Sequence, residues 1–211
     1  MSQVQETSLS QLYHRVLDLI PTGRTLDYDD KMITDIPDVE VIERRTFILK
    51  QCLDKVILDV GCKGSFHAEL KAVTKKCYGI DRDIVKEDPD FKQVVIGKDP
   101  IPIYEDVEIV VCGEVIEHLS NPGMFLDELR TSYPTQMKII SVPNAFSNGH
   151  QGWIKKGQEN TNKDHVAYYT YVTLKGLLSK HGYKIEEFYW YDNPEHIQIQ
   201  GLNEGMVVVT V

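Results

Sequence analysis

"VILDVGCKGSF", residues 56–66, joins a short apolar run to a turn that contains two glycines. The run is interrupted only by Asp59, which predicts a buried strand that ends close to a carboxylate. Gly61 and Gly64 follow, and glycine lets a ligand approach the backbone closely. Because glycines are also common in purely structural turns, this stretch alone does not separate a binding site from an ordinary strand-to-helix turn.

Apolar strands alternate with helical stretches from residue 55 onward. We predict strands at 55–60, 76–81, 93–97, 107–112, 137–142, 183–191 and 206–211, with helices near 38–53, 65–74, 83–90, 121–132 and 170–181. This alternation predicts an α/β fold in which a seven-stranded, mostly parallel sheet carries helices on both faces. No helix separates the last two strands, so we expect them to pair antiparallel.

The chain divides into an N-terminal helical segment, residues 1–53, and a larger domain, residues 54–211. The first segment is polar and is a candidate lid over a bound ligand. Within the larger domain, residues 145–165 form a long polar connection, and loops of that length are usually functional or mobile. Aromatic residues gather between Trp153 and Tyr191, either as core packing or as the apolar wall of a ligand pocket.

The overall charge of the chain bears on its partners. The 211 residues carry a formal net charge of −9, and no basic run is longer than a lysine pair. Binding to nucleic acid requires clustered Lys and Arg that neutralise phosphates, so nucleic acid is disfavoured as a partner. Hydrophobic residues make up 42% of the chain, which is enough to build the core of a globular domain.

The four cysteines are widely spaced and form no C-x-x-C pair. This pattern indicates reduced thiols rather than disulfides or a zinc site. No N-terminal apolar segment resembles a signal peptide, and no run reaches the roughly 18 apolar residues that a membrane span needs. We therefore expect a cytoplasmic protein with no membrane partner, and the sequence carries no signal for an oligomeric state.

A second acid follows the next predicted strand. "CYGIDRD", residues 77–83, ends that strand in Asp81. Ligands of open parallel sheets bind beyond the carboxyl ends of the strands, and an acid at this point suits the two hydroxyls of a ribose. The alternative is that Asp81 only caps the following helix.

Two later stretches complete a pattern. "DVEIVVCGEVIEHLSNPG", residues 106–123, and "IISVPNAFS", residues 139–147, follow the two acid-bearing strands in order. Together the four segments resemble the class I S-adenosylmethionine-dependent methyltransferases, in particular their small-molecule branch, which includes the ubiquinone-biosynthesis O-methyltransferases. The resemblance implies a Rossmann-like class I methyltransferase fold with an antiparallel last strand. It also implies transfer of a methyl group from S-adenosylmethionine to a small molecule, at oxygen.

The resemblance assigns the cofactor-binding residues position by position. It implies that the methionine end lies against Asp59, Gly61 and Gly64, the ribose against Asp81, the adenine against Asp99, and the sulfonium against Gly113 and Glu114. The family usually has D-x-G-x-G-x-G, whereas this chain has D-V-G-C-K-G-S, with either Lys63 at the middle glycine or a one-residue deletion, so the local cofactor geometry is open. Nicotinamide binding fits less well, because the G-x-G-x-x-G fingerprint is incomplete.

Two histidines lie where the resemblance places the acceptor. His118 belongs to the E-V-I-E-H-L segment, and His165 follows the long loop. An oxygen acceptor must lose its proton, and histidine is the usual general base near neutral pH, so both are candidate catalytic residues. The alternatives are an interior histidine bonded within its own turn for His118, and a loop cap for His165.

The same segment suggests a metal site. On a helix, Glu114, Glu117 and His118 would stand at i, i+3 and i+4 and share one face. Carboxylates and an imidazole suit Mg²⁺, Mn²⁺ or Zn²⁺. Small-RNA 2′-O-methyltransferases with a similar segment hold a metal this way, and His165 would be the later histidine that completes the site. Many relatives share the segment without a metal, so the metal is an alternative here.

Three functions are consistent with these features. The first is a methyltransferase that uses S-adenosylmethionine and acts on a small molecule, most simply at oxygen. The second is an RNA 2′-O-methyltransferase with a divalent metal, which the E-x-x-E-H segment favours and the net charge opposes. The third is a regulatory protein that binds S-adenosylmethionine without turnover, and the altered glycine pattern is its only support.

Overall fold

The computed structural model describes residues 35–83, 88–192 and 200–211. The chain divides into two units, Met1–Asp35 and Ile36–Val211. Every helix and strand that the structure describes lies in the second unit. Most of the predicted N-terminal segment, residues 1–34, lies outside the described residues, and so does the question of a lid.

The elements follow the predicted alternation of strands and helices. In chain order they are β1 Val41–Ile42, α2 Arg44–Cys52, β2 Val56–Val60, α3 Ser65–Val73, β3 Lys76–Asp81, β4 Phe91–Gln93, β5 Ile109–Gly113, the short 3₁₀ helix η2 Ile116–His118, α4 Pro122–Ser132, β6 Met137–Pro143, α5 Asn148–Ile154, α6 Tyr171–Lys180, β7 Ile185–Tyr191 and β8 Gly205–Thr210.

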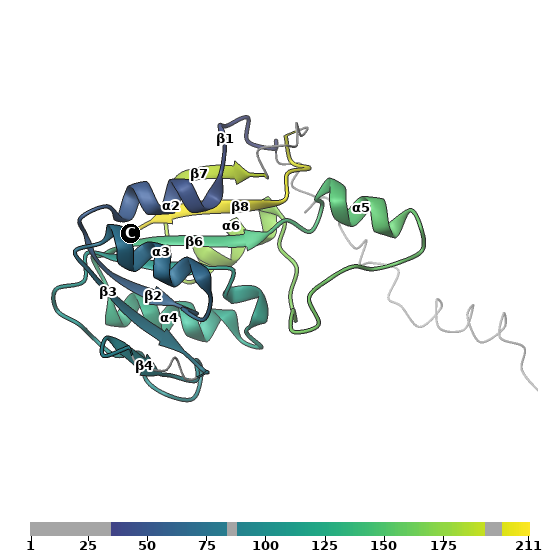
Figure 1. The fold of residues 1–211 in the computed structure, drawn as a ribbon. Helices are drawn as coiled ribbons and strands as arrows, with labels where there is room; N and C mark the ends of the chain where they lie inside the picture. Colours follow the sequence, from purple (N-terminus) through teal and green to yellow (C-terminus); the bar gives the residue numbers. More distant parts are fainter. Residues whose placement is uncertain (1–34, 84–87, 193–199) are drawn as a thin grey trace, which may run out of the picture. The chain divides into compact units, whose positions relative to one another are not determined.

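The strands form one sheet in the order β1-β7-β8-β6-β5-β2-β3-β4 (Figure 1). The segment from β6 to β4 is parallel, whereas β8 runs antiparallel to both β6 and β7. The predicted antiparallel pairing of the last two strands is confirmed. The predicted count of seven strands is too low, because the described part of the chain contains an eighth strand. This is β1, two residues long, which pairs parallel with β7.

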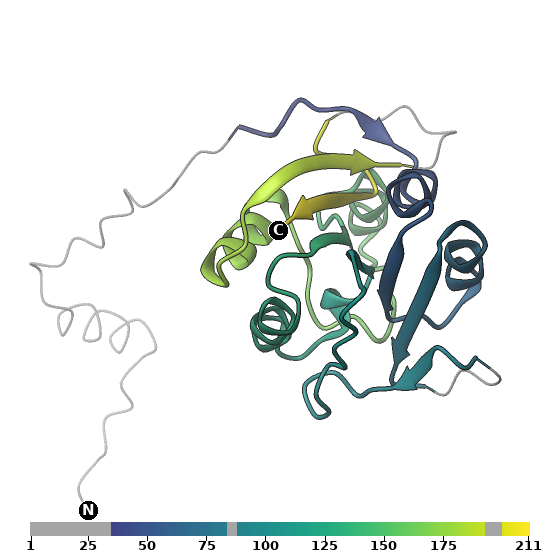
Figure 2. The ribbon, with the colours of Figure 1, turned by 90° about the vertical axis from the view of Figure 1, so that its left-hand side faces the viewer.

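Helices cover both faces of the sheet, as predicted (Figure 2). On one face, α2 and α3 pack against a cluster that includes Ile48, Ile57 and Leu70. On the other, α4 and α6 pack against a larger cluster that includes Leu58 and Leu126. All five residues of β2 are buried, because successive side chains of a central strand enter opposite clusters. The carboxyl end of β2 is therefore held firmly between two cores.

Three predicted elements differ from the structure. The helix expected over 38–53 is confined to α2, because residues 41–42 extend into β1. The strand expected at 93–97 is β4, which ends at Gln93. The helix expected at 83–90 is wrong for the residues described there, since Asp83 is a bend and 88–90 lead into a turn. The exposed edge position of β4 explains its weak apolar signal.

The long connection at 145–165 contains a helix that the sequence did not predict. This helix, α5, has no buried residue. Its N-terminus is set by Ser147, whose hydroxyl accepts a hydrogen bond from the amide of His150 at 3.2 Å. The amide of Ala145, at the start of the connection, donates to the carbonyl of Tyr169, just after its end, at 2.7 Å, so the two ends meet beside β6.

Among the described residues, no helix is long and apolar enough to cross a membrane.

Candidate active site

The turn after β2 requires glycine at its first position. Gly61 has a φ of 77°, a conformation that favours glycine. A Cβ atom there would lie 2.8 Å from a methyl carbon of Val115, so the turn leaves no room for a side chain. The amide of Gly61 donates to the carbonyl of Ile80 at 2.8 Å, which ties the turn to β3.

Lys63 replaces the usual middle glycine without disturbing this turn. Among the described residues other than glycine, positive φ values occur only at Asp54 and Glu114, so Lys63 has an ordinary backbone conformation. Its amide donates to a carboxylate oxygen of Asp81 at 3.0 Å, and its Nζ lies 2.6 Å from Asp83. The lysine therefore closes the turn onto the end of β3.

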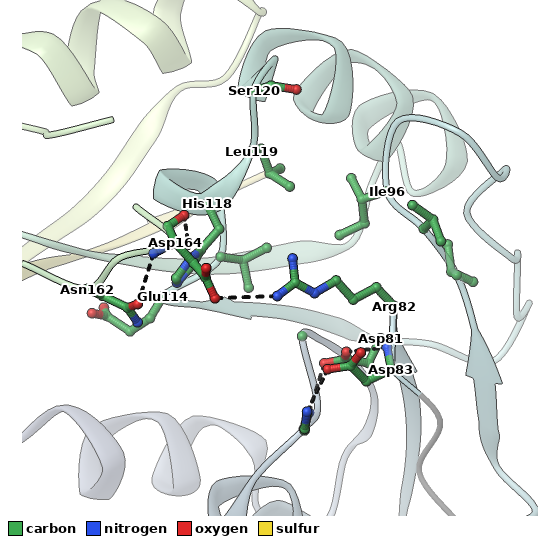
Figure 3. Close-up of a pocket in the computed structure, with 15 residues that line it drawn as sticks. Asp81, Arg82, Asp83, Ile96, Glu114, His118, Leu119, Ser120, Asn162 and Asp164 are labelled. Atoms are coloured by element: carbon green, nitrogen blue, oxygen red, sulfur yellow. Dashed lines mark hydrogen bonds and ion pairs between the residues drawn. The ribbon is translucent and has the colours of Figure 1, made fainter. Parts of the chain in front are cut away.

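A cavity of about 500 Å³ lies beyond the carboxyl ends of β2, β3 and β5 (Figure 3). It is lined by Gly61, Lys63, Asp81, Arg82, Asp83, Val94, Val95, Ile96, Glu114, Val115, His118, Leu119, Ser120, Asn162 and Asp164. Three residues predicted to bind the cofactor, Gly61, Asp81 and Glu114, line this cavity. The candidate base His118 lines it too.

The other predicted cofactor residues surround the cavity without lining it. Asp59 is buried, and its carboxylate contacts His67 at 2.8 Å. Gly64 is the residue before α3. Asp99 accepts a hydrogen bond from the amide of Val95 at 2.8 Å, so it shapes the 95–99 turn behind the cavity wall. Gly113 is the last residue of β5.

Glu114 is held in a strained and mostly enclosed position. Its φ is 58°, which costs free energy for a residue with a side chain and is typical of functional sites. The hydroxyl of Ser141 donates to its carboxylate at 2.9 Å, and Arg44 Nη1 lies 3.9 Å away. Burial raises the pKa of Glu114, although Arg44 and Ser141 favour its charged form. Arg44, on α2, was not among the predicted site residues, and no sequence signal marked it.

The predicted helix face of Glu114, Glu117 and His118 is wrong in one respect. The helical part of this segment is only η2, and Glu114 lies before it with a positive φ. β5 must end in a sharp turn, so Glu114 points to Arg44 and Ser141 instead of continuing the helix. Glu117 and His118 remain neighbours on η2.

His165 reaches the same place from the far end of the long loop. Nε2 of His118 lies 3.9 Å from Glu117 Oε1, and Nε2 of His165 lies 4.0 Å from the same atom. One potential ligand atom from each of the three residues lies within 4.8 Å of the others. Two backbone amides, those of Val166 and Ala167, donate to the carbonyl of Glu117 and fix the loop here.

Glu117 is the most unusual member of this group, which we call the Glu117–His118–His165 cluster. Its side chain is 1% exposed, and neither carboxylate oxygen has a hydrogen-bond partner among the described residues. Burial, assisted by the charge of Glu114, raises the pKa of Glu117 to about 8. A buried, unpaired carboxyl group is costly in the absence of a counter-charge.

The cluster fits a divalent cation. Two ligands about 2.0–2.2 Å from one ion can lie up to about 4.4 Å apart, which accommodates the separations around Glu117. Each histidine keeps Nε2 toward Glu117, while its Nδ1 faces a separate oxygen. His118 Nδ1 lies 3.2 Å from the carbonyl of Asp164, and His165 Nδ1 lies 3.5 Å from the hydroxyl of Thr161. Such outer partners orient metal-binding imidazoles. Burial and the neighbouring His118 lower the pKa of His165, which favours its neutral, ligating form.

A contact across the cavity joins its two sides. Arg82, at the end of β3, lies 3.6 Å from the carboxylate of Asp164, on the loop next to His165 (Figure 3). The amide of Asp164 also donates to the side chain of Asn162 at 3.1 Å. The β3 side of the cavity thus meets the loop that carries the cluster.

Comparisons with known proteins agree with this arrangement. Residues 7–187 match a family model described as a methyltransferase domain. No curated protein matches the sequence. A solved structure of the small RNA methyltransferase HEN1 superposes with a TM-score of 0.59 and 21% identity, over 82% of this chain and 27% of that one. The chain thus corresponds to only about a quarter of HEN1.

Two further solved structures share the fold. A SAM-dependent methyltransferase from Archaeoglobus fulgidus superposes with a TM-score of 0.53 and 13% identity, over 79% of this chain and 93% of that one. Magnesium protoporphyrin IX methyltransferase from Synechocystis PCC 6803, solved with bound SAH, superposes with a TM-score of 0.55 and 12% identity, over 99% of this chain and 90% of that one. With the family match and the cavity beyond β2, β3 and β5, the chain belongs to the methyltransferase domain family and is a class I methyltransferase that uses S-adenosylmethionine.

Proposed function

We propose that this methyltransferase acts on a hydroxyl oxygen of a small molecule, and that the Glu117–His118–His165 cluster holds a divalent cation at the acceptor. The observation that carries the proposal is the buried carboxylate of Glu117, which has no hydrogen-bond partner in residues 35–83, 88–192 and 200–211 and faces two imidazoles at the edge of the cofactor cavity. A buried ionisable group of this kind is typical of a functional site.

The residues around the cavity have distinct tasks in this proposal. Asp81 would accept hydrogen bonds from the ribose of S-adenosylmethionine, and Gly61 would leave room for its methionine end. A bound divalent cation would lower the pKa of the acceptor hydroxyl and orient its oxygen. With Nε2 of His118 and of His165 bound to the cation, neither imidazole would keep a free lone pair, so the proton of the acidified hydroxyl would pass to water; the general-base role predicted for these histidines applies only if no cation binds.

The acidic lining favours a small acceptor over a polyphosphate chain. Asp81, Asp83, Glu114 and Asp164 all line the cavity. The two cations of the lining, Lys63 and Arg82, are each paired with one of these acids. A cavity of this kind suits the positive sulfonium of the cofactor and offers few free charges to phosphates.

An RNA 2′-hydroxyl is the second candidate acceptor. The fold likeness to the small RNA methyltransferase HEN1 and the convergence of Glu117, His118 and His165 support it. The net charge of −9 opposes it. The two candidates share the same oxygen chemistry and differ in what must bind around the hydroxyl.

A methyl-transfer assay tests both candidates together. Protein treated with a chelator would be incubated with methyl-labelled S-adenosylmethionine and three acceptor sets: phenols and catechols, sugars, and short single-stranded RNAs. Each set would be assayed without metal, with Mg²⁺ and with Mn²⁺. We expect labelled small molecules only when a cation is added.

Matched variants distinguish the loss of a cation ligand from the general effect of replacing a histidine. His165→Asn should abolish the cation-dependent signal, whereas His181→Asn, in a histidine–carboxylate pair with Asp127, should leave it unchanged. Full activity in chelator would contradict the cation site. Labelled RNA with unlabelled small molecules would replace the first candidate by the second.

A further inference from the structure

A second histidine–carboxylate network lies beneath the glycine turn, away from the cation cluster. Its centre is His67 on α3, whose side chain is 7% exposed. Nδ1 of His67 lies 2.8 Å from Asp59, and Nε2 lies 3.3 Å from Asp88. Lys71, one turn along α3, places its Nζ 2.8 Å from the same oxygen of Asp88. The ring is thus held on both sides by carboxylates.

Space for this ring comes from a glycine on the neighbouring strand. Gly79 of β3 stands opposite Asp59 of β2 in the parallel register. A Cβ atom at Gly79 would lie 2.9 Å from Cε1 of His67 and 2.8 Å from the sulfur of Cys62. Any larger residue would displace the ring or the turn, so the network depends on Gly79.

Each wall of the cofactor cavity is attached to one arm of the network. Asp59 lies two residues before Gly61, the first residue of the turn. His67 belongs to the first turn of α3, the helix that follows Lys63 and Gly64.

The other arm reaches the far wall. Asp88 accepts a hydrogen bond from the amide of Asp90 at 3.0 Å, and the carbonyl of Asp90 accepts one from Gly79 at 3.1 Å. β4 follows, and Val94 after it lines the cavity and donates to the carbonyl of Asp81 at 2.9 Å.

We infer that His67 is a positioning residue for S-adenosylmethionine: through Asp59 and Asp88 it holds the glycine turn, the ribose carboxylate and the β4 side of the cavity in one arrangement. His67 does not line the cavity, and its effect on the cofactor passes through the segments it joins. Losing it should therefore weaken cofactor binding more than it slows the bound complex.

The charge of the ring matters for this role. Burial disfavours the charged form, but the hydrogen bonds and charges of Asp59 and Asp88 raise the pKa of His67 overall. Among the described residues, the other titratable groups near the ring include Cys77, whose sulfur lies 3.7 Å from Nδ1, Lys71, which faces Asp88, and Cys62, which shares the space beside Gly79. When His67 loses its second proton, it can still donate from Nδ1 to Asp59, but Nε2 then faces Asp88 with a lone pair. Rising pH should release the Asp88 arm.

Three variants and one matched control test the inference by calorimetric titration with S-adenosylmethionine and with S-adenosylhomocysteine. His67→Leu removes both contacts, and His67→Asn retains a donor toward Asp59. Asp88→Asn leaves the His67 ring in place and removes the negative charge that faces its Nε2. His181→Leu breaks an equally short but more exposed pair with Asp127 of α4, at 2.9 Å, and neither of these two residues lines the cavity.

We expect His67→Leu to weaken binding of both ligands by about tenfold or more, His67→Asn to recover most of that loss, and His181→Leu to have no effect. If His67→Leu does not fold, the affinities of His67→Asn and Asp88→Asn for both ligands are compared with those of the wild type, and this comparison tests the inference. Unchanged affinity in both, or an equal loss in His181→Leu, would overturn the inference and leave His67 a residue of general stability.

The pH dependence gives a readout that a merely structural role would not move. Wild-type affinity should fall as pH rises above the usual range of a histidine, and His67→Asn should lack that component. Ionisation of the ligand itself is common to both proteins and cancels in the comparison. Identical pH profiles for the two proteins would also overturn the inference.

Discussion

Glu117 combines two properties that rarely occur together in a stable core. Its side chain is 1% exposed, and within the described part of the chain its two oxygens have no hydrogen-bond partner. Leaving such a group buried costs stability, and sequences usually retain such a cost only where function requires it. Nε2 of His118 and Nε2 of His165 lie 3.9 and 4.0 Å from its Oε1. The residue therefore makes sense as one ligand of a cation held with these histidines.

A single substitution, Glu117→Gln, tests whether the buried carboxylate costs stability without a cation and binds the cation when it is present. The amide removes a buried ionisable group, so we expect the metal-free variant to be at least as stable as wild type. Because the pKa of Glu117 is raised to about 8, wild-type stability without metal should fall as pH rises from about 4.5 toward 8, and the variant should lack that fall.

Thermal unfolding measured in chelator and again with Mn²⁺ gives the stability of the metal-free protein and the stabilisation by the cation. Mn²⁺ should raise the melting temperature of the wild type and leave that of Glu117→Gln unchanged. Glu186→Gln, an exposed acid that pairs with Lys184, is the matched control and should respond to Mn²⁺ like the wild type. Equal stabilisation of all three proteins would place the cation elsewhere.

Asp81 carries the corresponding test for the cofactor. It lines the cavity, and its carboxylate also accepts the amides of Lys63 and Asp83. We expect Asp81→Ala to weaken S-adenosylmethionine binding by about 1.5–3 kcal/mol, the range for hydrogen bonds to a charged group. Calorimetric titration measures this, with Asp127→Ala as an exposed control that does not line the cavity. An unchanged dissociation constant would remove Asp81 from the ribose site.

At the scale of elements, the central strands were predictable because burial on both faces makes them rich in apolar residues. β3 lies where the sequence places it, and β2 begins one residue later. β1 was not predictable, since a two-residue strand exists only through its pairing with β7. The edge strand β4 is short and partly exposed, so its apolar pattern is too weak to fix its limits.

The site divides in the same way. Strand ends and glycine turns have local signals, so Gly61 and Asp81 were named from the sequence and lie at the cavity. Contacts between segments far apart in the chain leave no local signal in the sequence. Arg44 reaches Ser141 from α2, and His67 is held by Asp88 21 residues away, and neither residue stood out in the sequence.

The loop at 145–165 carries a prediction at this scale. α5 has no buried residue, whereas the end of the loop is fixed where Val166 and Ala167 donate to Glu117. We expect amides of α5 to exchange rapidly with solvent in the absence of acceptor and to gain protection when acceptor binds, as the loop closes over the site and brings Trp153 inward. Hydrogen exchange with and without acceptor measures this.

His165→Ala is the companion variant. The imidazole lies beside Glu117 and does not line the cofactor cavity, so turnover should fall far more than S-adenosylmethionine affinity. His150→Ala, on α5, tests whether any loop histidine has this effect. Unchanged turnover in His165→Ala would return that residue to the role of a loop cap.

At the scale of the whole molecule, charge decides between the two acceptors. The net charge is −9, and the lysine pair at 155–156 is one of only two in the sequence. Each phosphate contact needs a nearby Lys or Arg, and the affinity gained from such contacts falls steeply as salt is added. An acidic protein with paired cations at its cavity has little of this attraction to offer.

We therefore expect no measurable binding of a short single-stranded RNA at about 150 mM salt and at most weak, salt-sensitive binding at about 50 mM. Fluorescence anisotropy with a labelled RNA, in the presence of S-adenosylhomocysteine and Mn²⁺, measures both. The variant with Lys155→Glu and Lys156→Glu removes the basic pair next to the cluster-bearing loop. If wild type bound RNA tightly and this variant did not, the loop would be an RNA-binding surface, and RNA would become the acceptor of choice despite the net charge. If neither protein bound RNA while small hydroxyl compounds were methylated, the acid-rich cavity would be matched to an uncharged acceptor.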